Sequence, residues 1–320
     1  MIKEAILNLA KNQNISYNLA KESMNEIMGG KASDVQMSAY LTALSMKGET
    51  INEITASAEA MRSHCIKLLN DRDVLEIVGT GGDGSNSFNI STTASIVISS
   101  AGVPVAKHGN RASSSKSGAA DVLNEINLCF LFAQNYHIAM KYVAPIRKEL
   151  GIPTIFNILG PLANPAGATM QVMGVYDESL VKPLTEVLHN LGVKKALVVY
   201  GQDKLDEISV SSPTTVCEIK GDDIIDYVIE PEEFGFEKCS KNDLVGGNPD
   251  FNADITKSIL DGKKGPKRNA VVINAAAGLY VAGKVSSLNE GVILAEELID
   301  NGKARNQLKL FIDLSNKFRN

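Results

Sequence analysis

Residues 74–107 read VLEIVGTGGDGSNSFNISTTASIVISSAGVPVAK, and this stretch decides the fold. A short apolar strand is predicted over 74–78, and a glycine-rich turn follows it. A helix is predicted over 91–100 and a second apolar strand over 103–107. Two such strands joined by a helix form a βαβ unit, whose strands run parallel. The sequence therefore predicts an α/β domain with a mostly parallel central sheet.

Helical patterns without any strand pattern precede this unit. Capping-box sequences at 33–36 and 50–53 mark the starts of two helices. We expect a small N-terminal helical domain over 1–70, completed by helices from about 135–165. The larger α/β domain is then expected over 71–320.

The C-terminal side of the unit alternates between strand and helix patterns. Strands are expected over 196–200, 215–219 and 270–273, and helices over 137–150, 253–261, 275–282, 289–300 and 304–318. Pro145 lies inside the first of these helices and is expected to kink it.

Composition narrows the class of protein. The chain has 320 residues, a formal net charge of −5, 5% aromatic residues and no Trp, so a nucleic-acid partner is not expected. No apolar run approaches the roughly 18 residues of a membrane span, and the N-terminus predicts an amphipathic helix rather than a signal peptide. The four cysteines are widely spaced and form no Cys-x-x-Cys, which favours reduced thiols in a cytoplasmic protein.

The turn Gly79-Thr-Gly-Gly-Asp-Gly84, together with the helix start at Ser91-Thr92, predicts an anion site. Glycines let the backbone approach an anion closely, and a helix N-terminus favours negative charge. The turn also fits the dinucleotide pattern Gly-x-Gly-x-x-Gly, which requires an acidic residue at the end of the second strand. Lys107 occupies that position, and a cation suits phosphate better than ribose hydroxyls.

Two further segments follow strands and carry polar side chains. Residues 107–118 hold three Lys and Arg residues among serines and glycines, a composition suited to wrapping a polyanion. The segment Gly201-Gln-Asp-Lys-Leu-Asp206-Glu207 comes directly after the strand over 196–200. Its adjacent carboxylates, Asp206 and Glu207, can hold Mg²⁺ that also bridges a pyrophosphate. Because ligands bind at strand ends in parallel sheets, all three motifs are expected at one site.

Taken together, these segments resemble the anthranilate phosphoribosyltransferase family over nearly the whole chain. The segments that carry the resemblance are Val78-Gly-Thr-Gly-Gly-Asp83, Asn89-Ile-Ser-Thr92, Lys107-His-Gly-Asn-Arg111, Ser115-Lys-Ser-Gly-Ala-Ala-Asp121, Phe156-Asn-Ile-Leu-Gly-Pro-Leu-Ala-Asn-Pro165 and Leu205-Asp-Glu207. The resemblance implies transfer of 5-phosphoribosyl from PRPP (phosphoribosyl pyrophosphate) to anthranilate with release of pyrophosphate, in tryptophan biosynthesis. It also implies two Mg²⁺ ions and a homodimer built on the helical domains.

The resemblance assigns roles to individual residues. For PRPP the matching positions are Gly79, Gly82, Asp83, Ser87, Asn89, Ile90, Ser91, Thr92, Lys107, His108, Gly109, Asn110, Arg111, Ala112, Ser113, Ser114, Ser115 and Ala119. For anthranilate they are Gly79, Asn110 and Arg147, with His108, His137 and Pro161 along its route in. For magnesium they are Ser91, Asp206 and Glu207. Lys107, Asp206 and Glu207 are expected to act in catalysis, because cleavage of PRPP leaves negative charge on the pyrophosphate.

The chain departs from the usual family sequence at two places. Residues 121–130 form a short, direct connection, where the family usually has a further helix and turn. Pro153 stands where the family commonly has an arginine, which removes a cation from the region next to Arg147.

Three alternatives remain open at this stage. A pyrimidine nucleoside phosphorylase shares the two-domain architecture, but the adjacent carboxylates Asp206 and Glu207 favour the transferase. A non-catalytic nucleic-acid-binding relative is disfavoured by the net charge of −5. A dinucleotide oxidoreductase is disfavoured by Lys107.

Overall fold

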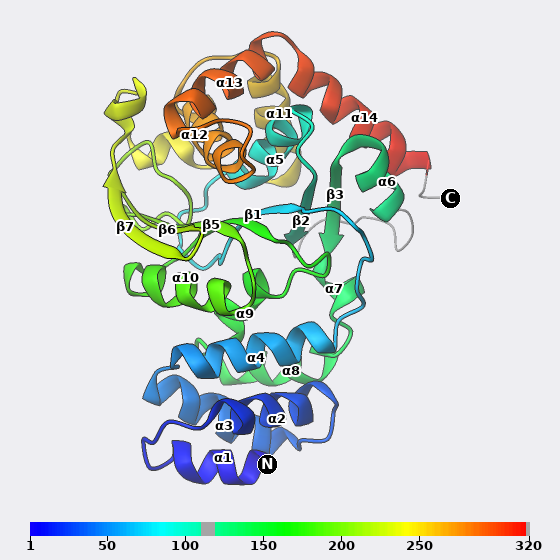
Figure 1. Cartoon of the computed structure of the whole chain (residues 1–320), viewed down its shortest axis with the longest axis vertical. Helices are drawn as coiled ribbons and strands as arrows, with labels where there is room; N and C mark the ends of the chain where they lie inside the picture. Colours follow the sequence, from blue (N-terminus) through cyan, green and yellow to red (C-terminus); the bar gives the residue numbers. More distant parts are fainter. Residues whose placement is uncertain (110–118, 318–320) are drawn as a thin grey trace.

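Helices alone make up the N-terminal part of the chain, as the sequence predicts. They are α1 (Ile2–Leu9), α2 (Tyr17–Met28), α3 (Asp34–Lys47) and α4 (Ile51–Ser63) in the computed structural model, which describes residues 1–109 and 119–317 (Figure 1). Ser33 caps α3 through a capping box with Gln36, and Thr50 caps α4 through one with Glu53. Both helix starts expected from the capping sequences are therefore confirmed.

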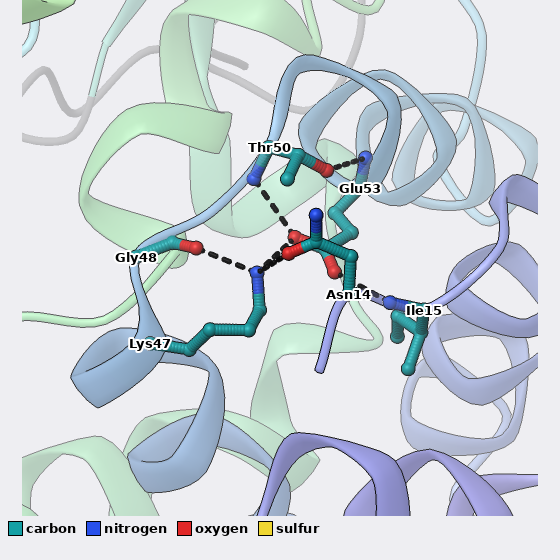
Figure 2. A network of polar contacts seen from close by, with 6 residues as sticks. All are labelled: Asn14, Ile15, Lys47, Gly48, Thr50 and Glu53. Carbon is teal, nitrogen blue, oxygen red and sulfur yellow. Dashed lines mark hydrogen bonds and ion pairs between the residues drawn. The ribbon is translucent and has the colours of Figure 1, made fainter. Parts of the chain in front are cut away.

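A buried ion pair ties the connections between these helices together (Figure 2). Lys47 Nζ lies 2.8 Å from Glu53 Oε2, and the two side chains are 4% and 0% exposed. The Glu53 carboxylate also accepts hydrogen bonds from the backbone N–H groups of Ile15 and Thr50, and Lys47 donates to Asn14 Oδ1. The network thus fixes the α3–α4 turn against the connection between α1 and α2.

The described residues contain one sheet of seven strands in the order β3-β2-β1-β4-β5-β6-β7. The strands are β1 (Leu75–Gly79), β2 (Val105–Gly109), β3 (Leu128–Phe132), β4 (Met170–Gly174), β5 (Lys195–Gly201), β6 (Thr214–Lys220) and β7 (Asp223–Ile229). The first five are parallel and the last two antiparallel. The mostly parallel sheet is confirmed, whereas β3, β4 and β7 were not expected from the sequence.

Helices cover both faces of this sheet (Figure 1). On one face lie α5 (Ile90–Ser100), α6 (Ala119–Ile126), α11 (Pro249–Leu260), α12 (Pro266–Val281), α13 (Leu288–Asp300) and α14 (Lys303–Lys317). On the other lie α9 (Phe156–Leu162) and α10 (Val181–Asn190), with α4 and α8 (Met140–Leu150) beyond them. The short α7 (Ala133–Tyr136) follows β3. One hydrophobic cluster runs from Leu41 through Leu188 to Val198, so the helical part shares its core with the sheet.

The prediction of a strand over 270–273 is wrong, because these residues lie within α12. Most of this helix is buried, so its sequence after the first turn is largely apolar, interrupted by Asn274, and shows no clear helical periodicity. Pro266 begins it, at the position where a missing backbone N–H costs nothing. The helix expected over 275–282 is the second half of α12. The helix expected over 137–150 is α8, which begins at Met140 and contains Pro145.

A single residue, Asn127, connects α6 to β3. Its φ of 58° lies in the left-handed region, which asparagine tolerates better than most residues. The Asn127 N–H donates to the carbonyl of Leu123, and its side chain accepts a hydrogen bond of 2.6 Å from Arg72. The short connection between residues 121 and 130 is therefore a tight helix-to-strand turn.

Within the described residues, no helix combines the length and apolarity needed to cross a membrane.

Candidate active site

The carboxyl ends of β1 and β4 meet where the chain changes direction across the sheet. From β1 the chain continues to β2 on one side, and from β4 it continues to β5 on the other. Ligands of open α/β sheets bind at such a switch point. The paired residues Gly79 and Gly174 end these two strands and form the floor of the site.

The connection after β5 passes directly over this glycine pair. A Cβ atom on Gly174 would lie 1.7 Å from the carbonyl oxygen of Asp206, and a Cβ atom on Gly79 would lie 2.1 Å from Asp206 Oδ2. Neither position therefore accepts a side chain while Asp206 keeps its place. Sequence reasoning selected Gly79 but missed Gly174, whose only signal is a glycine at the end of an apolar segment.

The glycine-rich turn after β1 and the carboxylates after β5 interlock. Gly81, Gly82 and Gly84 have φ values of 71°, 81° and 67°, a conformation that favours glycine. Asp206 Oδ2 accepts a 2.7 Å hydrogen bond from the N–H of Gly81. Glu207 accepts a hydrogen bond from the N–H of Ser91 in the first turn of α5. Both carboxylates are therefore bound to backbone N–H groups of a segment 116 to 125 residues earlier in the chain.

Asp206 and Glu207 are both buried, and Glu207 Oε1 accepts a 3.1 Å hydrogen bond from the N–H of Ser91. Burial raises the pKa of Asp206 to about 7, with a further contribution from the negative charge of Asp83. Burial raises the pKa of Glu207 to about 8, and the neighbouring Asp206 adds to this. Among the described residues neither carboxylate has an ion-pair partner within 4 Å. A divalent cation would compensate such a pair of charges.

Lys107 lies beneath this site, with its side chain buried. Its Nζ donates to the carbonyl of Ile77 at 2.7 Å and to Ser91 Oγ at 3.0 Å. Burial lowers the pKa of Lys107, and the carboxylates of Glu207, Glu76 and Asp206 partly offset that effect. The contact holds the Ser91 hydroxyl at the start of α5.

A cavity of about 400 Å³ adjoins the switch point, between the ends of β1 and β2 and the helices α8 and α9. Residues on its wall include Gly79, His108, His137, Arg147, Asn157 and Pro161. The structure therefore brings together every anthranilate position implied by the resemblance that lies within the described residues. Asn157, which the position-by-position resemblance did not assign, also faces this cavity.

Arg147 is a half-buried cation on the cavity wall. Its Nη2 donates a 3.1 Å hydrogen bond to Asn157 Oδ1, and its Cζ lies 5.6 Å from the centre of the Phe156 ring. Burial lowers the pKa of the guanidinium. In the described part of the chain no carboxylate forms an ion pair with it, although Glu149 lies two residues away. A guanidinium in this setting fits a carboxylate of a bound ligand.

His108 and His137 stand side by side on the cavity wall, with ring centres 5.0 Å apart. Both are buried, and burial lowers their pKa values to about 3 and about 4. Both rings are therefore neutral at pH 7. In the described part of the chain, His108 Nε2 is buried without a hydrogen-bond partner. The two residues contribute buried, uncharged rings to the cavity wall.

The other predicted PRPP positions are distributed around the switch point. Asp83 accepts a 3.0 Å hydrogen bond from the N–H of Ser85, and Ser87 forms a β-bridge with Val245. Ile90 is buried in the hydrophobic core, so only its backbone can meet a ligand. Four further positions, Gly82, Asn89, Thr92 and Gly109, lie in the glycine-rich turn, at the start of α5 and at the end of β2, and Ala119 begins α6. Six positions, Asn110, Arg111, Ala112, Ser113, Ser114 and Ser115, lie outside the described residues.

Comparison with protein families agrees with this architecture. The helical bundle domain of the glycosyl transferase family matches residues 3–65, and its a/b domain matches residues 71–128 and 122–305. The two a/b matches meet at the short connection between α6 and β3. The fold and site therefore define a glycosyl transferase with a helical bundle and an α/β part.

Individual relatives narrow this class. An anthranilate phosphoribosyltransferase of Methanobrevibacter smithii is 67% identical over 334 residues, covering 99% of this chain and 100% of the relative. A crystal structure of anthranilate phosphoribosyltransferase from Thermus thermophilus is 39% identical, with a TM-score of 0.91, and covers 98% of this chain and 99% of that one. One from Saccharomyces cerevisiae in complex with PRPP and Mg is 29% identical, with a TM-score of 0.90, and covers 99% and 98% of the two chains. The chain belongs to the anthranilate phosphoribosyltransferase family.

Proposed function

We propose that this chain transfers the 5-phosphoribosyl group of PRPP to the amino group of anthranilate and releases pyrophosphate, a step of tryptophan biosynthesis. One observation carries the proposal: Gly79 belongs to both halves of the site. It lies on the wall of the cavity that holds Arg147, and it lies against the carboxylate of Asp206. An acceptor in the cavity would therefore meet a donor held by the glycine-rich turn at this glycine.

The donor side consists of the glycine-rich turn, the start of α5 and the two buried carboxylates. Backbone N–H groups of the turn and the positive end of α5 can hold phosphate oxygens. Lys107 keeps the Ser91 hydroxyl in place at the same helix start. The six positions of residues 110–115 complete the proposed PRPP contacts.

Magnesium fits this donor side. Asp206, Glu207 and Ser91 would hold the ion, because Mg²⁺ commonly binds one or two protein carboxylates together with substrate phosphates. Two ions are proposed, as the family resemblance implies. The described residues contain no cluster of three His, Cys, Asp or Glu side chains suited to a metal, in keeping with a site completed by substrate oxygens. When bound, the metal neutralises the negative charge that develops on pyrophosphate.

The acceptor side orients a planar anion. Arg147 can bind the anthranilate carboxylate through two parallel hydrogen bonds, which directs the amino group towards the ribose. The aromatic amine is unprotonated at neutral pH and needs no strong base to attack. The neutral rings of His108 and His137 line this cavity without adding positive charge beside the developing charge on the ribose.

A direct assay tests this function. The protein is mixed with PRPP, Mg²⁺ and anthranilate, and the loss of anthranilate fluorescence is followed over time. We expect the signal to fall only when all three are present. If anthranilate persists, while inorganic phosphate and a pyrimidine nucleoside react, the chain is a phosphorylase instead.

We also propose a cytoplasmic homodimer. Leu7, Val35 and Met46 are exposed apolar side chains on α1 and α3, which lie at the end of the molecule remote from the sheet, and Tyr142 is another on the neighbouring helix α8 (Figure 1). A second copy would bury them. Each of the four cysteines is free, as expected in a reducing compartment. Analytical ultracentrifugation that showed a monomer at micromolar concentration would contradict the dimer.

A further inference from the structure

Asn274 is a fully buried polar residue in the middle of α12, a helix composed largely of apolar side chains. Its side-chain amide pairs with both backbone groups of one distant residue. Oδ1 accepts a 3.0 Å hydrogen bond from the N–H of Ile208, and Nδ2 donates a 2.9 Å hydrogen bond to the Ile208 carbonyl. A second 2.9 Å bond from Nδ2 goes to the carbonyl of Ala270 in the same helix. All the main hydrogen-bonding groups of this amide are therefore used.

Ile208 directly follows the two carboxylates of the proposed metal site. It lies in the connection between β5, which ends at Gly201, and β6, which begins at Thr214. Because this connection lies outside the sheet, strand pairing cannot hold the backbone of Ile208. Asn274 supplies the partners that a neighbouring strand would otherwise provide, and an unpaired buried N–H or C=O is costly.

Ile208 is one peptide bond from Glu207 and two from Asp206, so a fixed backbone at Ile208 limits where both carboxylates can lie. Glu207 Oε1 must meet the N–H of Ser91, and the Asp206 carbonyl must fit against Gly174. Both contacts form only if the backbone of residues 206–207 keeps its position and orientation over the switch point. The two hydrogen bonds from Asn274 fix the backbone of the next residue, Ile208.

We infer that Asn274 is a positioning residue for the metal carboxylates: it holds the backbone at Ile208 and thereby aims Asp206 and Glu207 into the site. The inference rests on the proposed function, in which these carboxylates hold Mg²⁺. The side-chain amide of Asn274 bonds to the backbone of Ile208 and Ala270, and Asn274 is not among the residues that line the cavity. Residues that orient metal ligands typically change metal affinity about 10- to 100-fold when they are removed.

The test compares Asn274→Ala with a matched control, Ile273→Ala. Ile273 precedes Asn274 in α12 and is equally buried, but it belongs to the hydrophobic core and makes no side-chain hydrogen bond. Both substitutions leave a cavity in the same helix, so both are expected to lower the melting temperature. Two quantities are measured: the Mg²⁺ concentration that gives half-maximal turnover, and the Mg²⁺-dependent binding of pyrophosphate by calorimetry.

We expect Asn274→Ala to raise the half-maximal Mg²⁺ concentration about tenfold or more and to weaken pyrophosphate binding, whereas Ile273→Ala leaves both at the wild-type value. A lower melting temperature with unchanged Mg²⁺ dependence would overturn the inference and leave Asn274 a structural residue. If Asn274→Ala does not fold, Asn274→Ser, which keeps one hydroxyl near Ile208, carries the same test. If wild-type protein consumes no anthranilate, the proposed function fails, and pyrophosphate binding still decides the role of Asn274.

Discussion

Replacing Arg147 by alanine tests the acceptor site most directly. Its guanidinium is half-buried, donates to the neutral Asn157 and has no carboxylate partner in the described part of the chain. The charge is therefore available to a ligand. Losing a charged, bidentate contact in such a partly desolvated cavity costs about 2–4 kcal/mol. This corresponds to a fall of about 30- to 1,000-fold in kcat/KM for anthranilate.

The defect is expected for the acceptor alone, because Arg147 lies on α8 and the PRPP segments lie at the sheet. Steady-state kinetics with each substrate varied in turn measure it. Arg147→Lys should recover only part of the loss, since an ammonium cannot form the planar pair. Lys148→Ala removes an exposed cation from the next position of the same helix and is the matched control. Equal changes in the constants for both substrates would show that Arg147 is structural, and no change would place the acceptor elsewhere.

The remaining predictions concern the metal, the floor of the site, the helical part and pH. Asp206→Asn combined with Glu207→Gln should lower Mg²⁺-dependent turnover by at least about 100-fold. The melting temperature should not fall, because the amides match the carboxyl groups in size and bring no charge into the buried site; unchanged turnover across a Mg²⁺ titration would exclude the pair. Gly174→Ala should displace the connection after β5 and lower both stability and turnover, because its Cβ atom would overlap a backbone carbonyl; a crystal structure with the connection unmoved would refute this. Lys47→Met should cost about 3–5 kcal/mol in urea unfolding, because it leaves its fully buried carboxylate partner unpaired, and a loss below about 1 kcal/mol would contradict the reasoning. His137 has a folded pKa of about 4, below its unfolded value of roughly 6.5, so its contribution to stability is present above pH 6.5 and lost as the pH falls towards 4. His137→Asn should therefore reduce the loss of stability between pH 6.5 and 5 by up to about 1.4 kcal/mol per pH unit, and identical slopes in urea unfolding would argue against a buried neutral ring.

Much of the fold and site could be predicted because the signals are local. The capping boxes at Ser33 and Thr50 place helix starts through contacts within one turn. The turn after β1 needs glycine at positions where φ is positive, so the turn can be predicted from these few residues alone. The same holds for Asp206 and Glu207, which lie in the short connection that follows the apolar strand β5.

Other elements could not be predicted, because their sequence is ambiguous at short range. Residues 270–273 are apolar and mostly β-branched, which suggests a strand, yet they lie in a helix that packs against α5, α13 and the sheet. Burial on all sides removes the polar face from which helical periodicity is recognised. The strand β4 is short and its sequence shows no clear boundary, so neither β4 nor the site residue Gly174 at its end was predicted.

By itself the sequence determined the βαβ unit, the capped helices and the chemical types of the three site motifs, because each depends on backbone conformation or composition within a few residues. Only the tertiary structure decided how the motifs meet. Gly174 admits the Asp206 carbonyl, Asn274 holds Ile208, and Arg147 is left without an acidic partner among the described residues. The first two are contacts between residues tens of positions apart, and all three features arise from strand order and helix packing, which no local pattern of residues encodes.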